Sequence, residues 1–265
     1  MIELISLLVL AIVQGLTEFL PVSSSGHLVL MQHVLDTREG DVFFDVVLHL
    51  GTLGSVLAVY RREVRRLLRL DAPARSYILG LVVGTLPAVA VGLLAKDAVE
   101  SVFHSPVFAA WGLLVTAMVL FSTRGRGSLG ASLPDSWEPR PIPPLRALLV
   151  GVAQALAILP GISRSGSTIA ACLWLGIGRA EAARFSFLLS VPAITGALLL
   201  QVVSGDAPSG ASATEYLRLG LAALAAFGVG LLALRWTALA VVQSHFWRFS
   251  IYCLVVGVTA LFLLY

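Results

Sequence analysis

The sequence is poor in cysteine and charge and has one lysine, Lys96. Its two cysteines, Cys172 and Cys253, lie in apolar stretches, which excludes a disulfide framework or a cysteine-based metal motif. We expect both to be free, buried thiols. Charged residues make up only 12% and hydrophobic residues 58%, and the mean hydropathy is +0.92. This balance excludes a soluble enzyme and predicts an integral membrane protein.

Other features that the sequence lacks narrow the class of membrane protein further. The N-terminus carries Glu3 but no basic residue, and no small-residue cleavage site follows its apolar run, so we expect no cleaved signal peptide. The net charge of +3 is not concentrated on a soluble domain, so we expect no nucleic-acid partner. The apolar runs have helical length, which favours an all-α polytopic bundle over a membrane β-barrel.

Apolar segments follow one another along the whole chain. We expect two interrupted helix pairs, at 3–35 and 147–177, and full spans near 43–60, 77–95, 105–122, 182–203, 216–235 and 248–265. Each interrupted pair is too short for two crossings, so both should be re-entrant hairpins. The prediction is one transmembrane domain, 1–265, with about six full transmembrane helices.

The two interruptions carry the same motif, 140 residues apart. Gln14-Gly-Leu leads to Pro21-Val-Ser-Ser-Ser-Gly-His, and Gln154-Ala-Leu leads to Pro160-Gly-Ile-Ser-Arg-Ser-Gly. A membrane helix that breaks leaves backbone groups unpaired, and this is tolerated only against protein or a wet cavity. The chain therefore reads as two repeats, 1–122 and 147–265, joined by a connection at 123–146.

The distribution of arginine predicts the orientation. The 61–75 loop holds six arginines and the 123–146 connection holds four, so both should be cytoplasmic. Arg179 and Arg184, near Glu181, should then form an ordinary cytoplasmic helix start, while Arg38, Lys96 and Arg218 fall outside. Three spans per repeat would insert the second repeat upside down, and the tips 23–27 and 163–168 would meet inside the bilayer.

Glu18 stands in apolar helical sequence, four residues after Gln14 and on the same helix face. Carboxylates inside a membrane are costly and usually functional. Glu18 is therefore a candidate general base or divalent-metal ligand, with Gln14 as a second oxygen donor. The alternative is a protonated carboxyl that serves only packing.

The serines after Pro21 are expected to open a short helix, where hydroxyls and free amides form an anion cradle. Ser24 and His27 lie one turn apart, so either Ser24 is activated by His27 or the imidazole itself attacks phosphorus. Simple helix capping is the competing interpretation. The residues expected to contact phosphate are Ser23, Ser25, Gly26, Ser163, Ser165, Gly166, Ser167 and Thr168.

Arg164 is the basic counterpart in the second motif. Its planar donors suit phosphate oxygens, although a structural ion pair with Glu18 would also explain a guanidinium at this depth. Asp45 and His49 share a helix face and are candidates for supporting the site. Hydroxyls, a histidine, a carboxylate and an arginine between apolar helices together indicate a phosphorylated lipid as the ligand.

At these residues the sequence resembles the bacterial undecaprenyl-diphosphate phosphatases of the bacitracin-resistance family. The matching stretches are 14–27, 159–168 and 184–192, and the span pattern agrees over essentially the whole chain. The resemblance implies a phosphoric anhydride hydrolase that converts the polyprenyl diphosphate to its monophosphate with a divalent cation, Mg²⁺ or Ca²⁺. It also implies recycling of this lipid carrier for peptidoglycan synthesis, and resistance to bacitracin.

The resemblance further implies a bacterial cytoplasmic (inner) membrane location with the active site open to the periplasmic side, and it leaves a homodimer open. By position, Glu18 would be the essential acid, Ser24 and His27 the nucleophile and base candidates, and Arg164 the phosphate clamp. Many family members have Glu where this chain has Gln14, which weakens the expectation of a two-carboxylate metal site.

A lipid flippase or another alternating-access transporter is the competing function, because broken inverted repeats also build such carriers. A Ser24–His27 pair favours the phosphatase, since transport alone does not require it.

Overall fold

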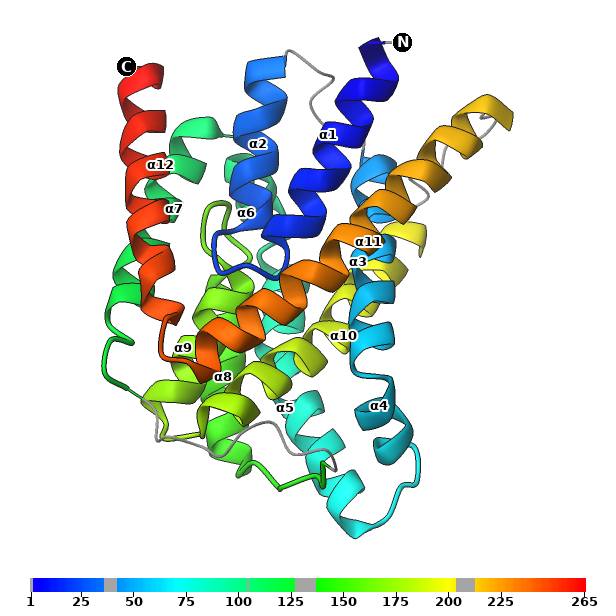
Figure 1. Cartoon of the computed structure of the whole chain (residues 1–265), viewed down its shortest axis with the longest axis vertical. Coiled ribbons are helices and arrows are strands. Elements are labelled where there is room, and N and C mark those ends of the chain that lie inside the picture. Colours follow the sequence, from blue (N-terminus) through cyan, green and yellow to red (C-terminus); the bar gives the residue numbers. More distant parts are fainter. Residues whose placement is uncertain (1, 36–41, 104, 127–136, 204–212) are drawn as a thin grey trace.

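The computed structural model describes residues 2–35, 42–103, 105–126, 137–203 and 213–265, and every regular element in these ranges is helical (Figure 1). Arg38 and much of the 123–146 connection lie outside the described residues. The helices are α1 (Ile2–Thr17), α2 (Ser24–Leu35), α3 (Val42–Val59), α4 (Arg61–Leu67), α5 (Ala72–Leu94), α6 (Lys96–Phe103), α7 (Pro106–Phe121), α8 (Pro144–Leu156), α9 (Arg164–Trp174), α10 (Arg179–Val203), α11 (Ala213–Val242), the 3₁₀ helix η1 (Phe246–Arg248) and α12 (Phe249–Leu264).

Four of these helices are long and apolar enough to cross a membrane. They are α5, α10, α11 and the η1–α12 segment, and α3 with α4 makes a fifth candidate that is bent by 77°. The all-α class is thereby confirmed, whereas the expected six full spans stay a prediction. α7 is strongly apolar but has only 16 residues.

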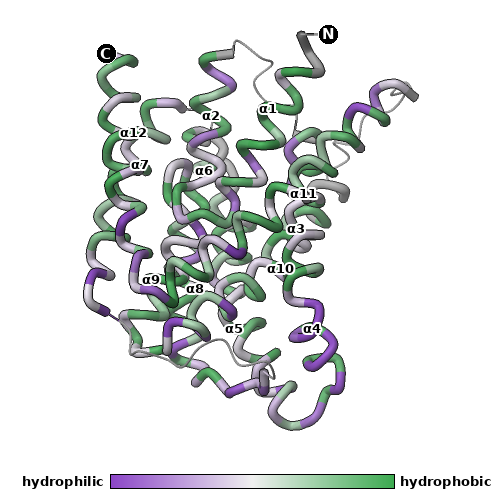
Figure 2. The backbone as a smooth tube through the Cα atoms, in the orientation of Figure 1, coloured by the Kyte–Doolittle hydropathy of each residue, from purple (hydrophilic) through white to green (hydrophobic). Residues whose placement is uncertain are grey.

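The outer surface of the bundle is apolar, as a lipid-facing surface must be. Leu94 is 87% exposed and Phe262 is 84% exposed, and Figure 2 shows hydrophobic residues along the outer helices and hydrophilic ones gathered at α4. α10 lies at the centre instead, where Phe185, Phe187 and Leu189 are fully buried. This helix contacts α3, α5, α9 and α11.

Local sequence explains several helix starts. Proline stands in the first turn of α5, α7 and α8, where its missing N–H costs no hydrogen bond. Asp71 caps α5 by accepting the amide of Ala74 at 3.0 Å, and Ser105 caps α7 by accepting the amide of Phe108 at 3.3 Å. The predicted spans therefore begin close to where the sequence placed them.

Two helix pairs are joined by turns inside the bundle. α1 and α2 extend from their turn toward the end that holds both termini, and α8 and α9 extend from theirs toward the opposite end (Figure 1). α1 packs on α11, and α8 packs on α5, so each pair rests on a helix from the other half of the chain. α7 and α12 also pack together.

The arginine-rich stretch after Tyr60 is not the plain loop that we expected, because part of it forms α4. A helix does start at Arg179, as expected, but it is not an ordinary exposed start, because both Arg179 and Arg184 are buried. The Glu181 carboxylate accepts hydrogen bonds from Tyr77 at 2.7 Å, Arg184 at 2.9 Å and Trp137 at 3.1 Å. Such full pairing makes a buried charge tolerable.

Candidate active site

The first turn places Glu18 just beyond α1, because the helix ends at Thr17 and not, as expected from the sequence, beyond Glu18. The backbone continues to Ser23, which has a left-handed φ of 70°. For a residue other than glycine this conformation is costly and is often found at functional sites. Ser23 Oγ accepts the amide of Gly26 at 3.2 Å and so caps α2.

The second turn is capped in the same way. Ser163 Oγ accepts the amide of Gly166 at 3.0 Å, at the start of α9. In each motif the capping hydroxyl also lies 3.3 Å from the hydroxyl of the serine two residues later, which is Ser25 in the first motif and Ser165 in the second. The Ser-x-Ser-Gly repeat thus encodes two helix starts with the same capping hydrogen bond, as the capping interpretation requires, although Ser163 has an ordinary φ of −72°.

The two turns touch. A Cβ on Gly26 would lie only 2.8 Å from the Cα of Gly161, so the backbones approach as closely as glycine permits. Ser165 Oγ donates to the carbonyl of Leu20 at 3.3 Å. The N-termini of α2 and α9 therefore come together, and the positive ends of both helix dipoles favour an anion there.

Glu18 is the centre of the polar contacts between the turns. It is 7% exposed, and its Oε1 is paired with Arg164 Nη2. Its Oε2 accepts Ser24 Oγ at 2.7 Å and Gln14 Nε2 at 3.1 Å. The ion pair with Arg164, considered above as the structural alternative, is present. Arg164 Nη1 and Gln14 Oε1 are buried without a hydrogen-bond partner among the described residues.

His27 has partners at both ring nitrogens. Nδ1 lies 2.8 Å from the carbonyl oxygen of Ser23, which can only accept, so Nδ1 carries a proton. Nε2 lies 2.9 Å from the hydroxyl of Tyr252, whose ring stacks on the imidazole with centroids 5.6 Å apart. Ser24, one turn away, donates instead to Glu18. In this arrangement the hydroxyl of Ser24 is directed to the carboxylate.

The remaining predicted residues surround this centre. His49 Nε2 lies 3.8 Å from Glu18 Oε2, and its Nδ1 lies 2.7 Å from the carbonyl of Asp45. Asp45 thus reaches the site through its backbone. Thr168 Oγ1 donates to the carbonyl of Arg164 at 2.8 Å, and Ser167 is buried on the same helix.

Each turn is held by residues from the other half of the chain. Thr116, on α7, donates to the carbonyl of Gly161 at 2.8 Å and accepts the amide of Ser163 at 2.9 Å. The first turn is held from α11 by Thr237, which donates to the carbonyl of Phe19 at 3.1 Å, and from α12 by Cys253, whose thiol donates to the carbonyl of Pro21 at 3.6 Å. Cys172 and Cys253 are free and buried, as expected.

The arrangement can bind and activate phosphate. It combines two helix N-termini, a guanidinium, several hydroxyls and a carboxylate that accepts a hydrogen bond from one of these hydroxyls. Sequence reasoning missed Tyr252, because it lies in an apolar helix far along the chain and no local motif marks it.

Comparison with known proteins matches residues 7–259 to the family of bacitracin resistance protein BacA. A protein from Korarchaeum cryptofilum is 39% identical over 281 residues, which cover 99% of this chain and 100% of the relative. A relative in Desulfosudis oleivorans is 44% identical and covers 94% of each chain. One in Rhodopirellula baltica is 41% identical and covers 98% of each chain. All three are named undecaprenyl-diphosphatase.

Proposed function

The chain belongs to the bacitracin resistance protein BacA family, and on this basis we propose that it is a multi-pass membrane enzyme that hydrolyses undecaprenyl diphosphate to undecaprenyl phosphate and inorganic phosphate. This activity returns the lipid carrier to peptidoglycan synthesis and confers resistance to bacitracin. One observation in the structure carries the proposal. Arg164 and the hydroxyl of Ser24 meet on the two oxygens of Glu18, where two helix N-termini come together.

Ser24 is the nucleophile in this proposal. Its hydroxyl already donates to Glu18 at 2.7 Å, so the carboxylate can take the proton as the oxygen attacks the terminal phosphorus. The bond from phosphorus to the bridging oxygen then breaks, and undecaprenyl phosphate leaves with that oxygen. Water hydrolyses the phosphoserine, which releases inorganic phosphate and restores Ser24.

Arg164 and the helix N-termini bind the phosphate oxygens. When the diphosphate enters, its negative oxygens compete with Glu18 for the guanidinium, and the ion pair opens. Glu18 is then free to act as the base. The amides at the starts of α2 and α9 stabilise charge that develops on the transferring group.

A divalent cation fits beside Glu18. The side chain of Gln14 contacts this carboxylate through Nε2, and its buried Oε1 has no hydrogen-bond partner among the described residues. Mg²⁺ usually takes one or two carboxylates and completes its shell with water and substrate phosphate. Glu18 and Gln14 would hold the ion, which would neutralise charge on the phosphate oxygens. In the described parts of the chain, no three His, Cys, Asp or Glu residues are grouped so that they could hold a metal ion by themselves.

The proposal extends to topology. Both helix pairs are re-entrant, the halves are inverted repeats, and the open end of the α1–α2 pair faces the periplasm from the cytoplasmic (inner) membrane. The turns in the interior of the bundle and the packing of α1 on α11 and α8 on α5 support this arrangement (Figure 1). The homodimer stays a prediction, which the mass of the detergent-solubilised protein tests.

Release of phosphate from undecaprenyl diphosphate tests the proposed function. With Mg²⁺, purified protein should be active, and Glu18→Ala and Arg164→Ala should each lower kcat/KM by about 10²–10³-fold or more. Arg164→Lys should also be poor, because an ammonium cannot replace the planar fork. Arg140→Ala, at an exposed arginine, is the control. Hydrolysis by Arg164→Ala at the wild-type rate would contradict the site.

A further inference from the structure

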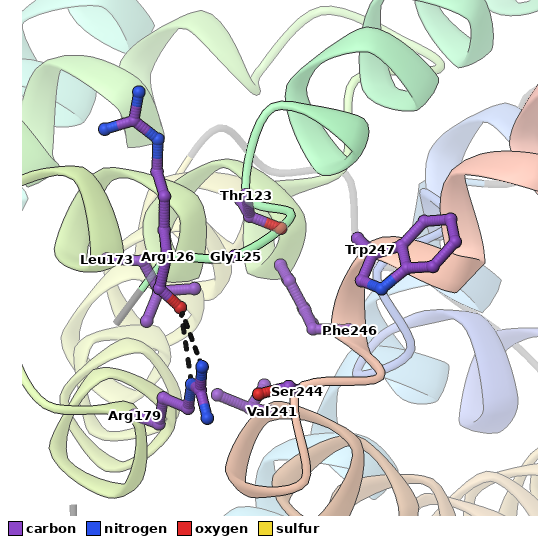
Figure 3. Close-up of a pocket in the computed structure, with 9 residues that line it drawn as sticks. All are labelled: Thr123, Gly125, Arg126, Leu173, Arg179, Val241, Ser244, Phe246 and Trp247. Atoms are coloured by element: carbon purple, nitrogen blue, oxygen red, sulfur yellow. Dashed lines mark hydrogen bonds between the residues drawn. The ribbon is translucent and has the colours of Figure 1, made fainter. Parts of the chain in front are cut away.

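A small cavity lies where the ends of α7, α9, α10 and α11 meet η1 (Figure 3). It is partly open, so that its space, including solvent at the mouth, is about 220 Å³, and it is lined by Thr123, Gly125, Arg126, Leu173, Arg179, Val241, Ser244, Phe246 and Trp247. Arg164 and Leu173 stand near opposite ends of α9, whose 11 residues span about 16 Å. The cavity is therefore separate from the candidate active site.

Arg179 is the main polar group of this cavity. It is 8% exposed, and its Nε and Nη2 donate to the carbonyl of Arg126 at 3.3 and 3.2 Å, as Figure 3 shows. A guanidinium has five N–H donors, so three remain. They have no partner among the described residues. The carbonyl anchors the group, and its spare donors line the cavity.

The other polar groups at the cavity favour an anion as well. The guanidinium of Arg124 lies 4.9 Å from the ring centroid of Trp247, which is one of the lining residues. Ser244 brings a hydroxyl on a backbone with a left-handed φ of 63°. No carboxylate lines the cavity, and in the described part of the chain none pairs with Arg124 or Arg179. The acidic residues that pair with arginine at this end serve Arg66 and Arg184.

Apolar surface continues from the cavity. Leu173, Val241 and Phe246 form its walls, and Trp247 packs edge-on against the exposed ring of Phe121 on α7. Ile251, one turn into α12, is also exposed. The charged head of an amphipathic ligand could therefore contact the hydrogen-bond donors of the cavity, while its apolar tail contacts the lipid-facing side chains beside it. Anionic lipid head groups bind in basic pockets of this kind at the cytoplasmic side of membrane proteins.

We propose that this cavity binds the phosphate group of an anionic phospholipid, with Arg179, Arg124 and Ser244 as its ligands and the acyl chains along α7 and α12. The hydrogen bonds to the Arg126 carbonyl use two of the five donors of Arg179. They leave three donors without a role at the cavity that this side chain lines. A phosphate oxygen can accept these donors in the bidentate manner that suits arginine. The inference goes beyond the phosphatase activity and does not depend on it.

Native mass spectrometry of the full-length protein in neutral detergent tests the proposal. Phosphatidylglycerol and phosphatidylcholine with the same acyl chains are titrated separately. The wild type should bind phosphatidylglycerol about tenfold more tightly or better, which corresponds to about 1.4 kcal/mol. Arg179→Gln and Arg124→Gln should remove most of this preference. Arg65→Gln, at an exposed arginine on α4, should keep it.

A second variant, a competing ligand and an activity assay complete this test. If Arg179→Gln does not fold, Ser244→Gly removes a hydroxyl without opposing the positive φ and should weaken binding of phosphatidylglycerol severalfold. Millimolar inorganic phosphate is added as a competitor, because free phosphate offers the same oxygens. Equal binding of both lipids, an equal loss in Arg65→Gln, or full displacement by inorganic phosphate would overturn the lipid assignment. Phosphatase activity in detergent, expected to be unchanged, reports folding of each variant.

Discussion

At the scale of single residues, the proposed chemistry depends on the different partners of the two carboxylate oxygens of Glu18. Glu18 uses one oxygen for a guanidinium from the other half of the chain and the other oxygen for a hydroxyl from its own turn. A buried carboxylate without partners would be protonated, because desolvation penalises its charge. In the structure Arg164 balances this charge, and in the proposed reaction the phosphate takes over the guanidinium and leaves Glu18 to accept the proton of Ser24.

Ser24→Ala should separate the nucleophile from its neighbours. The variant should lose at least about 10³-fold in kcat, as enzymes do when the attacking group is deleted. Ser25→Ala is the matched control, because the Ser25 hydroxyl lies beside Ser23 and not beside Glu18, and it should stay within about tenfold of the wild type. Phosphate release measures both, and mass spectrometry after a denaturing quench should find phosphoserine at 24. A phosphohistidine at 27 would instead make His27 the nucleophile.

Tyr252→Phe should reveal how much His27 depends on its hydrogen bond. The change removes the hydroxyl at 2.9 Å from Nε2 but keeps the stacked ring. Loss of one such bond should lower kcat/KM by about 3–10-fold and change the shape of the pH–rate profile, while thermal stability stays near the wild-type value. Tyr265→Phe, at the exposed last residue, should alter neither quantity. An unchanged pH profile in Tyr252→Phe would mean that Tyr252 only packs.

At the scale of elements, the two turns are equivalent parts supported from opposite halves. Each begins a helix with a capping serine and a glycine, and each is held by side chains from the partner half: Thr116 for the second turn, Thr237 and Cys253 for the first. The close approach of α7 to the second turn requires small residues. This is the usual solution where membrane helices pack without a hydrophobic driving force between them.

Gly112→Ala should disrupt this support. A Cβ at Gly112, on α7, would lie 2.2 Å from the carbonyl oxygen of Pro160, so the backbone of the second turn would have to move. We expect a loss of about 1–3 kcal/mol in stability and reduced phosphatase activity. Gly92→Ala on α5 meets nothing within 4 Å and should be neutral or stabilising, since alanine favours helix. Thermal unfolding in detergent compares the two, and equal midpoints would show that the packing is looser than described.

Hydropathy and the repeated motif predicted most elements, because their signals are local. The breaks near Ser23 and Ser163 and the spans around them follow from sequence. The helical form of α4 was missed because a run of arginines between apolar segments is typical of a loop. Glu181 looked like part of an exposed helix start, yet Tyr77 and Trp137 donate hydrogen bonds to it from more than 40 residues away. Such contacts have no local signature.

At the scale of the whole molecule, the site belongs to neither half alone. Glu18 and Ser24 come from the first half and Arg164 from the second, and α1 and α8 each pack on a helix of the opposite half. The halves therefore have to associate before the carboxylate and the guanidinium can neutralise each other inside the bundle. Assembly of the fold and assembly of the site are one event.

The same architecture decides the side from which substrate arrives. The α1–α2 pair opens toward the end that holds both termini, while the arginine-rich α4 lies at the other end (Figure 1). In intact cells a membrane-impermeant maleimide should therefore label Tyr265→Cys, whereas Arg65→Cys should react only after permeabilisation. The native Cys172 and Cys253 are fully buried and give little background. Labelling of Arg65→Cys from outside would contradict the proposed orientation, because the open end of the α1–α2 pair would then face the cytoplasm.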